Sequence, residues 1–262
     1  MFSKFIFVLS TLFIITNVLN ADKLADIKKA GVMVAGIKYD FKPFGFINKS
    51  GIIVGFDVDL LKYIANRLNV DLKFKQVTSK TRIPMIVSGE VDVAAASMTH
   101  KHKRDNVIDF SISYFFDGQA MLVRFDEKEA SFRGFENRKV AAIQGATSGN
   151  NLKKVQPKAK IIYYQEYPQA VLSLLKGTVD AITTDLVWCI TQAQDSRGKL
   201  KVLSETLSYE PYGIGMSENE SNLRDYINFA IQDAVRNGLE KKQKNYQKSG
   251  PTRLNNYLVY IF

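Results

Sequence analysis

The histidines and the cysteine offer little chemistry in this chain. His100 and His102 share one short basic loop, and Cys189 is the only cysteine. Histidines at i and i+2 could begin a metal site, but no third ligand is evident beside them. A single cysteine excludes an intramolecular disulfide, and no Ser-His-Asp or Cys-His arrangement is recognisable. We therefore expect no cofactor, no metal site and no nucleophilic enzyme.

Basic residues are the more informative chemical group. The 262 residues include 36 Lys and Arg against 26 Asp and Glu, which gives a formal net charge of +10. Such an excess favours anionic partners, nucleic acid among them. Many of the lysines, however, are scattered along the chain and are not interleaved with aromatic residues in one recognition motif. We expect no nucleic-acid partner, and 46% hydrophobic with 24% charged residues indicates a globular protein with a buried core.

The first 21 residues predict export. An apolar run over residues 5–15 follows Lys4, and a more polar stretch ends at Ala21. A basic start, a short apolar stretch and a small residue at the end are typical of a secretory signal peptide. A retained membrane anchor is the alternative, although the apolar run is short for a span. We expect a periplasmic product from which residues 1–21 have been removed.

Short apolar runs alternate with helical periodicity in the first half of the mature chain. Strands are expected at residues 32–37 and 91–96, which are short apolar runs, and at residues 72–77, where apolar and polar residues alternate. Helices are expected between them, one starting near Asp57 as a possible cap and one over residues 82–88. Strands separated by helices predict a largely parallel sheet with helices on its faces.

The second half of the chain repeats this order. Strands are expected at residues 139–143, 161–164 and 179–183, with helices at 150–155 and 168–176. Two similar α/β lobes follow from this repetition, joined near residues 120–125 and 210–216. The expected division is a first lobe of residues 22–122 and 212–262 and a second lobe of residues 123–211.

Several short motifs occur together in a characteristic order. They are Lys42-Pro-Phe-Gly-Phe46, Gly55-Phe-Asp-Val-Asp-Leu60, Ser88-Gly-Glu-Val-Asp92, Arg104 followed by Asp109-Phe-Ser111, Val179-Asp-Ala181 with Asp185, and Tyr212-Gly-Ile-Gly215. Each is weak alone, but their order is specific, and with them the sequence resembles the polar amino-acid-binding proteins of ABC transporters, the family-3 solute-binding proteins. Thr81-Arg-Ile-Pro84 is similar to a motif of the aspartate/glutamate-binding branch of that family, which is the nearest in motifs, and also to that of some cysteine binders.

The resemblance implies a two-lobed periplasmic-binding-protein clamshell of type II. In such a protein each lobe is a mostly parallel sheet flanked by helices, and a free amino acid is held between the lobes. The resemblance further implies a monomer that delivers its ligand to a membrane permease and does not act as an enzyme. Ligand binding at the carboxyl ends of strands agrees with the physics of open α/β sheets.

The same resemblance indicates which residues would bind the α-carboxylate and α-ammonium groups of the ligand. Arg104 would grip the α-carboxylate, which a guanidinium can bind through two hydrogen bonds, and Thr147 would help to hold it. Ser97 would supply a carbonyl and Thr99 a hydroxyl, while Asp185 would pair with the α-ammonium group. The alternatives are a solvated charge at Arg104, a plain tight turn around Thr147 and a helix cap at Asp185.

Three further residues bear on the ligand side chain. By the resemblance, Phe41 would stack on it, although a core aromatic would look the same in sequence. Lys38 stands where binders of basic amino acids carry an acid, so it disfavours a cationic ligand. Arg82 stands where other members often have an apolar residue. Together with Arg104 against Asp185, these cations predict an acidic amino acid, unless Lys38 or Arg82 points to solvent or bridges the lobes.

Two other functions remain open at this stage. The chain also resembles the cyclohexadienyl dehydratases of the same fold, in residues 39–44 and 117–119. Those enzymes carry a catalytic glutamate where Trp188 stands here, so the general acid is missing. The second alternative is a binder of cysteine or of another neutral polar amino acid.

Overall fold

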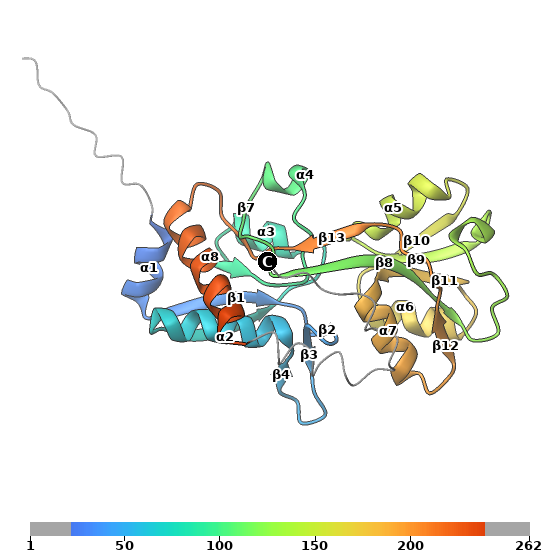
Figure 1. Ribbon diagram of the computed structural model, residues 1–262, viewed down its shortest axis with the longest axis horizontal. Helices are drawn as coiled ribbons and strands as arrows, with labels where there is room; N and C mark the ends of the chain where they lie inside the picture. The colour runs from blue at the N-terminus through green and yellow to red at the C-terminus, as the bar shows by residue number, and fades with distance from the viewer. Residues whose placement is uncertain (1–21, 239–262) are drawn as a thin grey trace, which may run out of the picture.

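The computed structural model describes residues 22–238. The expected signal peptide, residues 1–21, lies outside this range, as do residues 239–262. Figure 1 shows two lobes connected by the long strand β8 (Phe115–Arg124) and the shorter strand β13 (Tyr209–Tyr212). Between residues 22 and 238, no helix has the length and apolar character needed to cross a membrane.

The first lobe is built on a sheet with the strand order β5-β1-β6-β14-β7. Strand β1 runs parallel to β5 and β6, whereas β14 runs antiparallel to β6 and β7. A smaller sheet of β2, β3 and β4 extends beside it. The bounds are β1 Val32–Ile37, β2 Asp40–Phe41, β3 Gly45–Ile47, β4 Ile53–Val54, β5 Asp71–Gln76, β6 Val93–Ala94, β7 Asp109–Phe110 and β14 Gly215–Met216.

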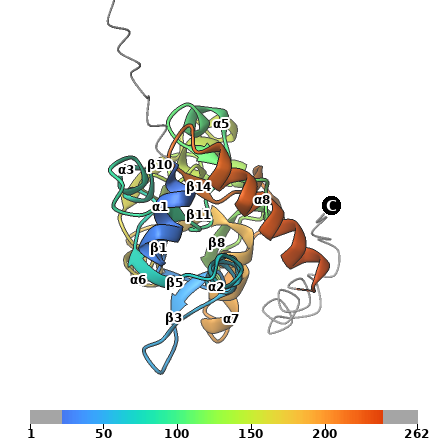
Figure 2. The same cartoon turned by 90° about the vertical axis from the view of Figure 1, so that its left-hand side faces the viewer.

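Amphipathic helices cover this sheet, and α2 and α8 pack against each other on its flank (Figure 2). Helix α2 buries Leu61, Ile64 and Leu68, the face that helical spacing predicts. The expected cap at Asp57 is wrong: Gly55 is the N-cap residue, and the Asp57 carboxylate turns into the core. The helices are α1 Lys23–Ala30, α2 Phe56–Leu68, α3 Arg82–Val87, α4 His102–Asp105 and α8 Ser221–Arg236.

The second lobe contains a sheet with the order β10-β9-β11-β8-β12, and β13 pairs with β8 beside this path. Strands β9, β10 and β11 are parallel, while β8 runs antiparallel to β11 and β12. The remaining bounds are β9 Lys139–Ile143, β10 Lys160–Tyr164, β11 Ala181–Asp185, β12 Leu200–Val202, α5 Ser148–Val155, α6 Tyr167–Leu175, α7 Leu186–Asp195 and a 3-10 turn at Phe132–Phe135.

The crossing between the lobes is an antiparallel ribbon of β8 and β13, in which Phe115 pairs with Tyr212 and Gly118 with Tyr209. From Gln119 onward, β8 pairs with β11 in the second sheet. This pairing favours a crossing slightly before the predicted boundary at residues 122–123, and the division into lobes stays a prediction.

The topology brings the ends of several strands to the space between the lobes. Lys38 directly follows β1, and Ser97 lies three residues beyond β6. From the second lobe, Thr147 follows β9 and Asp185 ends β11. Because the carboxyl ends of parallel strands share one edge of a sheet, residues far apart in the chain converge at this position.

Candidate ligand-binding site

A cleft of about 880 Å³ opens between the lobes. On the first lobe it is lined by residues around α4, including Lys101, Lys103 and Arg104, and on the second lobe by residues 144–147 and by α5. Two of the predicted site residues, Arg104 and Thr147, line this cleft directly. The other six are at most 8% exposed and lie in the interior, namely Lys38, Phe41, Arg82, Ser97, Thr99 and Asp185.

The two lobes touch across the cleft. Arg104 donates from Nη1 to the carbonyl of Thr99 in its own lobe (2.8 Å) and from Nη2 to the carbonyl of Gly145 in the other lobe (3.0 Å). At Gly145, a Cβ atom would overlap the backbone of Ser79, so the backbone segments of the two lobes approach closely there. At the rim, Lys42 pairs with Asp195 across the gap at 2.9 Å. The structure is therefore the closed form of the clamshell.

Arg82 is buried beneath the cleft, at the start of α3. Its Nη1 donates to the carbonyl of Ala96 at 2.6 Å and to that of Ser97 at 3.2 Å. Its Nε is buried without a hydrogen-bond partner. Burial lowers the pKa of the guanidinium, while Tyr167 and Asp185 act in the opposite direction. Arg82 is thus held from one side by backbone carbonyls, and it does not point to solvent.

Lys38 and Phe41 form a second buried group. The Lys38 ammonium lies 3.9 Å from the centroid of the Phe41 ring and 5.3 Å from that of Tyr167. Burial, reinforced by the charge of Arg82, lowers the pKa of Lys38 from 10.5 to about 7. Phe41 packs in turn on Tyr167 (4.8 Å) and Trp188 (6.2 Å) of the second lobe. Its ring therefore supports Lys38 and also forms part of the contact between the lobes.

Ser97 is held in place by a buried carboxylate. Asp57 accepts hydrogen bonds from the Ser97 N–H (3.0 Å), the Ser97 hydroxyl (3.3 Å) and the Tyr114 hydroxyl (2.9 Å). Ser97 has a φ of 47°, a left-handed conformation that serine seldom adopts. Burial raises the pKa of Asp57 to about 6, against the opposing effect of these hydrogen bonds. Asp57 thus stabilises the turn that exposes the Ser97 carbonyl to Arg82.

Asp185 is the N-cap residue of α7, but its side chain makes no capping hydrogen bond. This geometry goes against the helix-cap alternative. Burial raises the pKa of Asp185, opposed chiefly by Lys38. Nearby, Asp117 accepts from the N–H groups of Gly118 (2.8 Å) and Val187 (3.3 Å) and from the Tyr212 hydroxyl (3.2 Å). Burial and the charge of Asp185 raise the pKa of Asp117 well above its ordinary value.

Thr147 is likewise an N-cap residue, of α5, without a side-chain cap. Its hydroxyl instead donates to Glu210 at 3.0 Å and accepts from the Gln119 side chain at 2.6 Å. Thr99, from the first lobe, donates to the same Glu210 oxygen at 2.6 Å. The structure therefore links the two predicted threonines through a carboxylate that sequence reasoning missed.

The site thus contains more acidic groups than the sequence predicted. Asp57, Asp117 and Glu210 join Asp185, so the total charge of the region is no longer an excess of cations. The three additional carboxylates are held by neutral hydroxyl, amide and backbone donors. Among residues 22–238, no ion pair within 4 Å includes Lys38, Arg82 or Arg104. The same part of the chain holds no cluster of three or more potential metal ligands.

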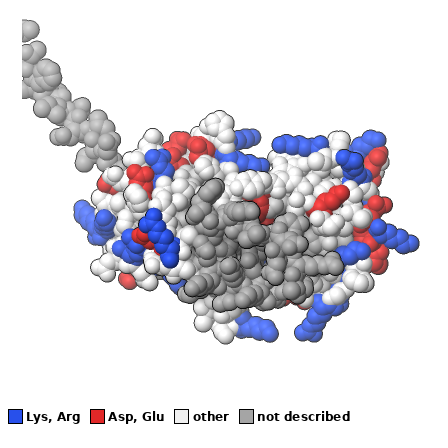
Figure 3. Space-filling model, viewed as in Figure 1, with Lys and Arg blue, Asp and Glu red and all other residues white. Residues whose placement is uncertain are grey.

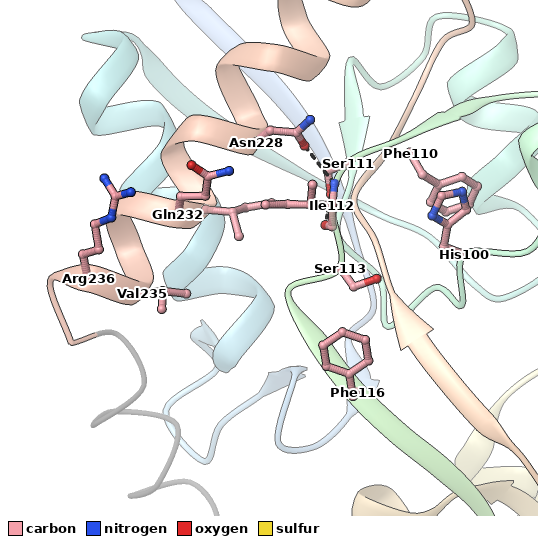
Figure 4. Close-up of a pocket in the computed structure, with 11 residues that line it drawn as sticks. His100, Phe110, Ser111, Ile112, Ser113, Phe116, Asn228, Gln232, Val235 and Arg236 are labelled. Carbon is pink, nitrogen blue, oxygen red and sulfur yellow. Dashed lines mark hydrogen bonds between the residues drawn. The ribbon is translucent and has the colours of Figure 1, made fainter. Parts of the chain in front are cut away.

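A second hollow of about 710 Å³ lies on the first lobe, between α8 and the segment 110–116 (Figure 4). Asn228 of α8 accepts from the N–H of Ile112 at 2.8 Å, and His100 stacks on Phe110 with 4.5 Å between ring centroids. His100 also lies 2.8 Å from Asp105. None of the predicted ligand-binding residues lines this hollow.

The fold and the site between its lobes define an extracellular solute-binding protein. The chain belongs to the bacterial extracellular solute-binding proteins, family 3, which residues 33–248 match. The glutamine-binding protein of Geobacillus stearothermophilus is 39% identical over 206 residues, covering 76% of this chain and 78% of the relative. The glutamate-binding protein GluB of Corynebacterium efficiens is 29% identical over 82% of this chain and 78% of its own length.

Solved structures show the same fold. An ancestral arginine-binding protein bound to glutamine superposes with a TM-score of 0.79 at 34% sequence identity, covering 82% of this chain and 97% of that one. The predicted family and the two-lobed α/β fold are both confirmed. Amino-acid binding is the function that the family and these relatives share.

Proposed function

We propose that this protein captures an acidic amino acid, glutamate or aspartate, between its lobes. The observation that carries the proposal is the pairing of charges. No ion pair within 4 Å includes Lys38, Arg82 or Arg104 among residues 22–238, while Asp57, Asp117 and Glu210 accept hydrogen bonds from neutral donors. A buried cation is costly unless it is paired. A ligand with two carboxylates would supply partners at both ends of the site.

The proposed contacts follow from where each side chain is held. Arg104 would bind the α-carboxylate, because among Lys38, Arg82 and Arg104 it is the one that lines the cleft. Asp185 and the Ser97 carbonyl would accept from the α-ammonium. Arg82 and Lys38, deeper in the site, would bind the side-chain carboxylate. Charge-assisted hydrogen bonds of this kind are about twice as strong as neutral ones.

Glutamine is the second candidate, supported by the ligand names of the relatives above. A carboxamide oxygen can accept from Arg82 or Lys38, but it brings no charge to balance them. Glutamate and glutamine differ only in this group, so their relative affinity measures how much of the recognition is ionic.

We further propose that the protein acts in the periplasm as a monomer, hands its ligand to the permease of an ABC transporter and binds no nucleic acid. Figure 3 supports the last point, because basic side chains are spread over both lobes of this face. We also propose binding without turnover. Trp188, whose position holds the catalytic glutamate of dehydratases, is buried between Phe41 and Tyr167 and offers no acid.

Isothermal titration calorimetry of the mature protein against the twenty amino acids tests the proposal. Glutamate or aspartate should bind at least ten times more tightly than glutamine, arginine or cysteine. Tighter binding of glutamine would establish the second candidate instead. Binding of arginine would refute the argument that Lys38 disfavours a cationic ligand. Incubation with prephenate or arogenate should give no product, and measurable turnover would overturn binding without catalysis.

A further inference from the structure

Glu210 joins the two lobes through hydrogen bonds that no predicted site residue accounts for. It lies on the crossing strand β13 and is completely buried. Its Oε2 accepts from Thr99 of the first lobe and from Thr147 of the second. Its Oε1 accepts from Asn151 of α5 at 2.8 Å and from Ser208 at 2.6 Å.

These four hydrogen bonds use the full capacity of an ionised carboxylate, which has about four acceptor positions. Asn151 and Ser208 are tied further to the side-chain oxygen of Gln119, at 2.7 and 3.1 Å. The carboxylate is therefore the centre of a network that includes one residue of the first lobe and two at the start of α5. Thr99 belongs to the first lobe and Thr147 to the second, so an opening that parts these two residues would break at least one of their hydrogen bonds to Glu210.

The network also decides what the two threonines can offer a ligand. A threonine hydroxyl has one proton, and both Thr99 and Thr147 donate theirs to Glu210. Thr147 in addition accepts from Gln119, which occupies one of its lone pairs. In this closed arrangement the Thr147 hydroxyl has no proton left for a ligand carboxylate. The only positions that either hydroxyl could still offer to a ligand are acceptor positions.

We infer that Glu210 is a positioning residue that orients both hydroxyls and favours the closed form by holding Thr99 and Thr147 to the crossing strand. The first part of the inference, the orientation of the two hydroxyls toward a ligand, rests on the proposed capture of an amino acid. Its second part, the bias toward closure, concerns the free protein and does not depend on which amino acid binds.

Glu210→Gln in the mature chain is the direct test. The amide keeps two acceptor positions and replaces the other two by donors, so the hydrogen bonds to the Thr99 and Thr147 hydroxyls can persist only in reversed direction, and all four lose the charge of the carboxylate. Small-angle X-ray scattering of the ligand-free variant should show a larger radius of gyration than the parent protein. The dissociation rate of the tightest amino-acid ligand should rise about tenfold or more, with the association rate nearly unchanged.

Glu220→Gln is the matched control, because Glu220 is also buried (8% exposed) but accepts from the N–H of Lys23 within the first lobe. It should leave the radius of gyration and both rates unchanged. Thr147→Val and Thr147→Ser provide a second route that does not depend on the folding of Glu210→Gln. The ligand-free Thr147→Val variant should have a larger radius of gyration than the parent protein, and Thr147→Ser should not.

The outcomes separate this inference from the proposed function. If the parent protein binds no amino acid, the proposed function fails, while the scattering of the ligand-free variants still decides the bias toward closure. If Glu210→Gln or Thr147→Val leaves both the radius of gyration and the dissociation rate at parental values, the inference is refuted.

Discussion

Arg82→Met tests whether the buried guanidinium recognises a side-chain carboxylate. Nη1 of Arg82 is engaged by the carbonyls of Ala96 and Ser97, and Nε has no partner, so one edge of the guanidinium remains for an anion. Removing one partner of a buried charge pair costs about 2–5 kcal/mol. At about 1.4 kcal/mol per tenfold change, glutamate should lose roughly 30- to 4,000-fold in affinity. Glutamine, through a neutral acceptor worth about 0.5–1.5 kcal/mol, should lose only about 2- to 12-fold.

The assay is calorimetric titration of glutamate and glutamine into parent and variant. The ratio of the two affinities is the decisive quantity, because Arg82→Met also leaves two carbonyls unpaired and any general loss of stability lowers both affinities alike. Arg124→Met is the matched control: Nη1 of Arg124 also donates to two carbonyls, those of Leu174 and Val179 at 2.9 Å, but in the second lobe away from the cleft. An equal loss for both ligands, or no loss, would refute the assignment of Arg82.

Three further predictions concern Lys38 and the two residues that join across the cleft. Burial and, after it, the charge of Arg82 lower the pKa of Lys38 to about 7, and a bound carboxylate should raise this pKa. Glutamate affinity should therefore fall as the pH rises above about 7 and Lys38 loses its proton, by up to about tenfold per pH unit. Calorimetric titrations between pH 6 and 9 would measure this fall. A flat profile would exclude Lys38 as a partner. Arg104→Lys removes the planar guanidinium whose two Nη atoms donate to the carbonyls of Thr99 and Gly145. Calorimetry should show about tenfold weaker binding of glutamate and of glutamine alike. A change for only one of the two ligands would contradict the α-carboxylate role of Arg104. Gly145→Ala should hinder closure and weaken the binding of every ligand about tenfold or more. Gly177→Ala is the control, because Gly177 has a similar φ of 73° but open space around it, and this variant should lower stability without changing affinity. Equal affinities of the two variants would show that the close approach at Gly145 is unimportant.

Most of the architecture could be predicted because local pattern and fold agree. The strand at residues 32–37 and the apolar face of α2 follow directly from burial on a sheet and on a helix. The strand expected at 91–96 is shorter in the structure, Val93–Ala94, because the chain turns at Ser97 toward Asp57. Positions at strand ends, such as Asp185, were predictable from the motifs of the family.

The acidic half of the site could not be predicted in the same way. Asp57 has the position and residue type of an ordinary helix cap, and only the three-dimensional path of residues 94–97 brings Ser97 to it. Glu210 and Asp117 lie on crossing strands, where side chains far apart in sequence meet. A buried carboxylate held by neutral donors leaves no charge pattern in the sequence, whereas the motif spacing around Arg104 does.

The contact of Phe41 with the second lobe has a practical consequence. Trp188 is the only tryptophan in the chain, it is 1% exposed, and its ring stacks nearly parallel to that of Phe41 at 6.2 Å. Its indole N–H is buried without a hydrogen-bond partner. Separation of the lobes would part the two rings and admit water to the indole. The protein therefore carries its own optical reporter of opening, and intrinsic fluorescence can follow the motion without any label.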